Sequence, residues 1–72
     1  MCTDADVVAL LALAMNATSK ERKAAALTLA AALRRGEARP EEFGGIIADA
    51  ARTYGDDVAA EARAIVTELR LG

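Results

Sequence analysis

The feature that most limits the fold is the short spacing between signals that start and stop helices. A capping box at Thr18 and Glu21 starts one helix, and Gly36 ends it. Pro40 begins the next helix, and Gly55 separates it from the last. Apolar residues recur at helical spacing between these signals. The sequence therefore predicts four short helices, at about residues 4–16, 19–35, 40–54 and 56–70.

Alanine supports the same interpretation, because it is the best helix former and lets helices approach closely. It occupies 19 of the 72 positions, whereas residues that favour strands are few. The predicted connections are short, so consecutive helices should be antiparallel neighbours. We expect one all-α domain over residues 1–72, built as two packed helical hairpins.

The two halves of the chain align when the sequence is shifted by 36 residues, which places Val7 on Phe43 and Leu11 on Ile47. An internal duplication would give this register. Two unrelated hairpins of equal length would also align their apolar stripes. The sequence leaves both explanations open.

Each predicted helix has an apolar face that should pack in the core. Next to the apolar face of helix 40–54, small residues at Gly44, Ala48 and Ala51 form a stripe that predicts a close helix contact. The residues expected in the core are Val7, Val8, Leu11, Ala14, Met15, Ala25, Ala26, Leu29, Ala30, Leu33, Phe43, Ile46, Ile47, Ala50, Tyr54, Val58, Ala62, Ile65, Val66 and Leu69.

Groups that carry catalysis are almost absent from the sequence. There is no histidine, and the only serine, Ser19, follows Thr18 in the capping box. The single cysteine, Cys2, can form neither an internal disulfide nor a zinc site. The acidic pairs 41–42 and 56–57 fall at predicted helix starts, where the helix dipole stabilises them. We expect no enzymatic activity, no catalytic residue, no cofactor and no metal.

Charge and hydropathy argue against a membrane protein. The net charge is −2, divided as +2 over residues 1–36 and −4 over residues 37–72. The longest uncharged run, Val7 to Ser19, has 13 residues, too few for the roughly 20 that span a bilayer. We expect no membrane span and a cytoplasmic location.

Two large residues, Leu13 and Leu27, stand off the expected core faces of their helices. If the first two helices are neighbours, these leucines could form one apolar patch for a protein partner. We predict a small non-enzymatic interaction module, such as an adaptor, an antitoxin-like inhibitor or a phage or host regulator, with a homodimer as the simplest outcome. The predicted interaction surface consists of Leu13, Leu27, Ala24, Ala31, Arg34 and Arg35.

Nucleic-acid binding by a small helix-turn-helix regulator is the alternative. Basic residues lie at the two ends of helix 19–35, where they could contact phosphates. However, the middle of that helix is alanine and leucine, and helix 40–54 opens with two glutamates. We therefore favour a protein partner over nucleic acid. The basic residues are Lys20, Arg22, Lys23, Arg34, Arg35 and Arg39.

Overall fold

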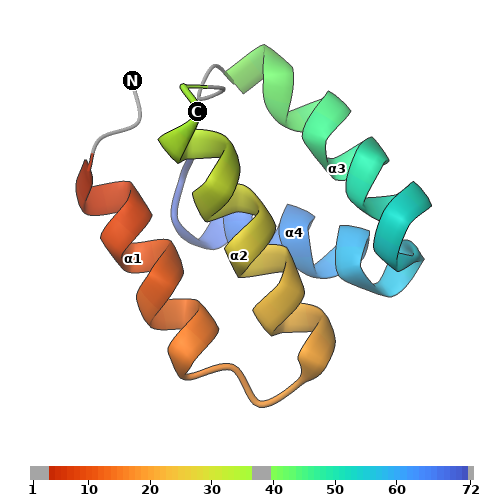
Figure 1. The fold of residues 1–72 in the computed structure, drawn as a ribbon, viewed down its shortest axis with the longest axis horizontal. Helices are drawn as coiled ribbons and strands as arrows, with labels where there is room; N and C mark the ends of the chain where they lie inside the picture. Colours follow the sequence, from red (N-terminus) through yellow and green to blue (C-terminus); the bar gives the residue numbers. More distant parts are fainter. Residues whose placement is uncertain (1–3, 37–39, 72) are drawn as a thin grey trace.

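The computed structural model describes residues 4–36 and 40–71, and all regular structure within them is helical (Figure 1). The predicted all-α fold of four short helices is confirmed. The observed helix ends lie within two residues of the predicted ones. The helices are α1 (Asp4–Met15), α2 (Lys20–Arg34), α3 (Pro40–Tyr54) and α4 (Asp56–Glu68).

The helices pack as two pairs, α1 with α2 and α3 with α4. In Figure 1, α1 and α2 run side by side in opposite directions, and α4 crosses behind α2. The pairs are joined mainly by α2 packing on α4, while α2 and α3 meet much less. Among the four helices, α1 comes close to α2 alone. Helix α1 therefore lies at the edge of the fold.

The start of α2 differs from the prediction in the residue that caps it. Ser19, rather than Thr18, is the N-cap, and its hydroxyl accepts a hydrogen bond of 3.1 Å from the backbone N–H of Arg22. Both residues carry a hydroxyl group that can cap a helix. The backbone decides between them, because Ser19 has the extended conformation typical of an N-cap.

Two glycines take positive φ values where one helix ends and the next begins. Gly36, at φ 84°, follows the last turn of α2, as predicted. Gly55, at φ 104°, occupies the N-cap position of α4. Neither Asp56 nor Asp57 is therefore the N-cap of α4. Both lie in the first turn of α4, where the helix dipole stabilises their charge.

The end of α4 turns the chain back toward the core. Arg70 has a left-handed φ of 54°, and its N–H bonds to the carbonyl of Thr67 at 3.2 Å. The N–H of Leu71 bonds to the carbonyl of Val66 at 3.0 Å. These two bonds define a Schellman motif, and they bury Leu71 against the core. Helix α2 instead ends with a glycine, Gly36, in the left-handed position. The ends of α2 and α4 therefore differ in sequence, and the internal duplication stays a hypothesis.

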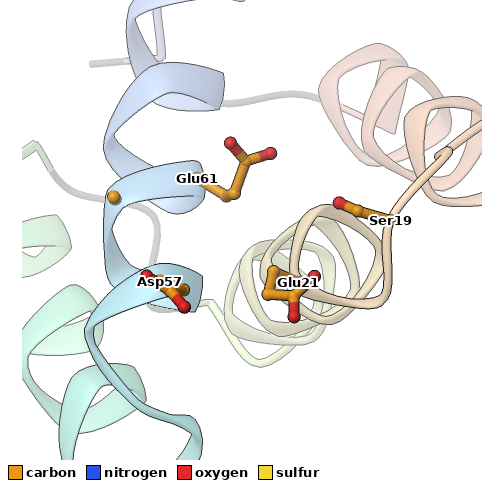
Figure 2. A pocket seen from close by; sticks show the side chains of 5 residues that line it. Ser19, Glu21, Asp57 and Glu61 are labelled. Atoms are coloured by element: carbon orange, nitrogen blue, oxygen red, sulfur yellow. The ribbon is translucent and has the colours of Figure 1, made fainter.

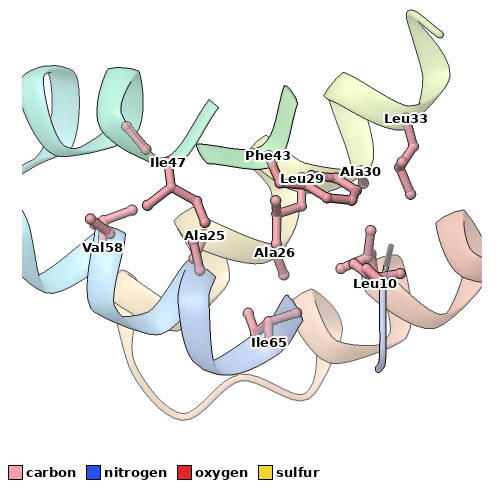
Figure 3. Packing of buried hydrophobic residues seen from close by; sticks show 14 of the residues in the cluster. Leu10, Ala25, Ala26, Leu29, Ala30, Leu33, Phe43, Ile47, Val58 and Ile65 are labelled. Carbon is pink, nitrogen blue, oxygen red and sulfur yellow. The ribbon is translucent and has the colours of Figure 1, made fainter. Parts of the chain in front are cut away.

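Apolar side chains from all four helices point into one core (Figure 3). No polar or charged side chain among the described residues is buried. The expected core faces of α2 and α4 are confirmed, although Val66 and Leu69 are only partly buried. The buried residues of the core are Leu10, Ala14, Ala25, Ala26, Leu29, Ala30, Leu33, Phe43, Ile47, Ala50, Val58, Ala59, Ala62, Ile65 and Leu71.

The predicted core face of α1 is wrong at Val8, Leu11 and Met15, whereas Ala14 is buried and Val7 packs against the core, as predicted. Leu10 is fully buried, whereas Val8 and Met15 are 64% and 85% exposed. Leu13, expected on the opposite side, is partly buried and packs against the core. Between Val7 and Met15 the helix is apolar on every side, so its periodicity does not select a face. Packing against α2 selects the face that carries Leu10.

The predicted core face of α3 is correct except at its end. Phe43, Ile47 and Ala50 are buried, and Ile46 is partly buried. Tyr54 is 58% exposed, contrary to the prediction. It is the last residue of α3, so its side chain lies at the end of the face that α4 and α2 cover.

Candidate interaction surface

The structure separates the residues of the predicted patch. Leu27 is exposed, as are Ala31 and Arg34, and these three share one stripe of α2 at the spacing i, i+4, i+7. Leu13 and Ala24 are partly buried and pack against the core instead. Arg35 is exposed at the C-cap of α2, where it lines two surface depressions.

A larger apolar surface lies on α1, where the sequence predicted core. Val8, Leu11, Ala12 and Met15 are all exposed. On a helix that advances about 100° per residue, these four fall within an arc of about 100°. We call them the α1 outer face. The missed signal was the absence of charge from Val7 to Met15, which leaves α1 no polar face to turn toward water.

The exposed stripe of α2 around Leu27 is basic. Lys20 and Lys23 precede Leu27 by seven and four residues, and Arg34 follows it by seven. All three basic residues are exposed, and no acidic residue occupies the stripe. The stripe, which we call the α2 basic stripe, is formed by Lys20, Lys23, Leu27, Ala31 and Arg34.

Arg22 is held on the other side of α2. Its guanidinium donates a hydrogen bond of 2.8 Å to the carboxylate of Glu68 and lies 3.8 Å from that of Glu61, both on α4. The hydrogen bond that Arg22 donates to Glu68 is the main cause that raises the pKa of Arg22. Arg22 therefore differs from the other basic residues at the start of α2: it links α2 to α4 and does not belong to the exposed surface that a partner could bind.

An acidic depression lies between the start of α2 and α4 (Figure 2). It is lined by Ser19, Glu21, Asp57, Ala60 and Glu61. The Ser19 hydroxyl already accepts a bond from the α2 backbone, and Glu61 faces Arg22. Over residues 4–36 and 40–71, no group of three or more Cys, His, Asp or Glu side chains could hold a metal ion. The depression is therefore acidic, but its described side chains do not form a metal-binding site.

A second depression lies between α2 and α3, the two helices that contact each other less than the other packed pairs do. Ile46 and Ala50 contribute apolar surface, and Asp49 and Tyr54 contribute polar groups. Asp49 forms an ion pair with Arg52 on its own helix. The Thr28 hydroxyl, on the α2 side, donates its hydrogen bond to the carbonyl of Ala24. Asp49 and Thr28 are thus both bonded within their own helices.

The predicted helix contact at Gly44, Ala48 and Ala51 is not made at its glycine. A Cβ atom at Gly44 or at Gly45 would meet no other described atom within 4 Å. Ala48 is exposed, and only Ala51 packs against the core. Both glycines therefore lie on an open helix surface, and no crowding within the described chain requires them.

Within the part of the chain that the structure describes, no helix combines the length and apolar character needed to cross a membrane. No buried side-chain polar atom there lacks a hydrogen-bond partner. Comparisons of the chain with protein-family models, with curated proteins and with solved structures found no match.

Proposed function

We propose that this chain is a small non-enzymatic protein–protein interaction module that recognises its partner, in the simplest case a second copy of itself, through the α1 outer face. The observation that carries the proposal is the exposure of Val8 and Met15, which are 64% and 85% accessible to solvent on one side of a single helix. Large apolar side chains that cluster on an exposed surface are typical of interaction sites.

The distribution of large apolar residues supports this proposal. Much of the core is alanine, which releases little hydrophobic free energy on burial. Nevertheless, Val8, Leu11 and Met15 lie outside the core on the same face. Burying such a side chain completely is worth about 1.5–3 kcal/mol. A partner that covers this face would therefore gain most of its affinity from two or three anchors.

The α2 basic stripe would form the polar side of the surface. Lys20, Lys23 and Arg34 are exposed charges around Leu27, and charges at a rim favour partners with acidic groups at matching positions. This arrangement keeps Leu27, Ala31 and Arg34 of the predicted surface and replaces Leu13 by the residues of the α1 outer face. Recognition would rest on helix-face packing, with Val8 and Met15 as anchors.

Self-association tests the proposal, by light scattering over a series of protein concentrations. We expect the wild-type mass to rise above that of a monomer, and Met15→Lys to raise the dissociation constant at least about tenfold. Leu27→Asp should weaken association less. Tyr54→Lys, which adds the same charge on an exposed residue of α3, is the matched control and should associate like the wild type. A wild-type chain that is monomeric at high micromolar concentration would refute the self-association.

Nucleic-acid binding is the second candidate, and the three exposed cations of the α2 basic stripe favour it. Phosphate contacts by Lys20, Lys23 and Arg34 would make the affinity for mixed-sequence DNA fall steeply with salt. Arg22 would not contribute, because it is paired with Glu68. Absence of DNA binding at low salt would exclude this candidate.

A further inference from the structure

We draw no further inference here: the strongest candidate, the α1 outer face at the edge of the helix bundle, belongs to the interaction surface already described, and nothing in the structure shows what covers it.

Discussion

The guanidinium of Arg22 and the carboxylate of Glu68 join α2 to α4 through a hydrogen bond of 2.8 Å between residues 46 positions apart. The two helices belong to different pairs, and their packing is the main contact that holds the pairs together. Glu61, two turns earlier on the same face of α4, adds a second carboxylate at 3.8 Å. A single arginine thus reinforces the junction between the two halves of the fold.

Replacing Arg22 by Met should lower the free energy of unfolding. It should also make that free energy depend less on salt, because the lost ion pair is partly open to solvent and is screened by salt. Lys23→Met is the control, since Lys23 is exposed beside it. Because the pKa of Arg22 is raised in the folded state, the stability that Arg22 contributes is fully present at neutral pH. On the alkaline side it is lost as the pH rises through that raised value. Denaturant unfolding at low and high salt measures the effect, and equal salt dependence in both variants would contradict it.

The two neighbouring leucines of α1 should respond very differently to truncation. Leu10 is fully buried, so Leu10→Ala should cost about 2–5 kcal/mol of stability. Leu11 is 37% exposed, so Leu11→Ala should cost less than about 1 kcal/mol in dilute solution. Denaturant unfolding of the two variants gives the comparison. Equal losses would mean that α1 packs with a different face.

Alanine at Gly44 or Gly45 should stabilise the chain by about 0.5–1 kcal/mol at each position. Both glycines lie within α3, and an added Cβ has open space around it. Gly36→Ala should instead destabilise by about 1–2 kcal/mol, because its φ of 84° is strained for alanine. Thermal unfolding distinguishes these outcomes. Destabilisation by Gly44→Ala would indicate a close contact that the isolated chain lacks.

Glycine at Arg70 should stabilise the chain by about 0.5–1 kcal/mol, because a non-glycine residue there adopts the left-handed conformation. The control is Arg63→Gly, at an exposed position inside α4, which should cost about 1 kcal/mol. Opposite signs in thermal unfolding are the expected result. A loss of stability in Arg70→Gly would show that the arginine side chain outweighs its backbone strain.

The sequence predicted the four helices and the core faces of α2 and α4 because polar and apolar residues alternate there with a clear helical period. Two features were beyond it. Helix α1 is apolar all round, so only its contact with α2 decides that Leu10 is buried and Met15 exposed. Leu71 is buried because the chain turns at Arg70, which adopts the left-handed conformation. The sequence does not indicate this turn, because the residue there is not a glycine.

For the interaction surface, the prediction of exposed Leu27 and Arg34 on α2 agrees with where the structure places them. The prediction placed Leu13 of α1 on this surface and the residues of the α1 outer face in the core, because a long uncharged stretch does not distinguish the two sides of the helix. A helix at the edge of a bundle has one neighbour, which can bury only one of its sides. The other side stays exposed to water even when it is apolar.

The most direct measurement is a dilution series of amide chemical shifts of the wild-type chain. We expect the amides of Val8, Leu11, Ala12 and Met15 to shift with concentration, those around Leu27 to shift less, and those around Tyr54 and Ala64 to stay constant. Shifts that stay constant everywhere up to high micromolar concentration, or that change around Tyr54 and not along α1, would contradict the proposal that this chain associates through the α1 outer face.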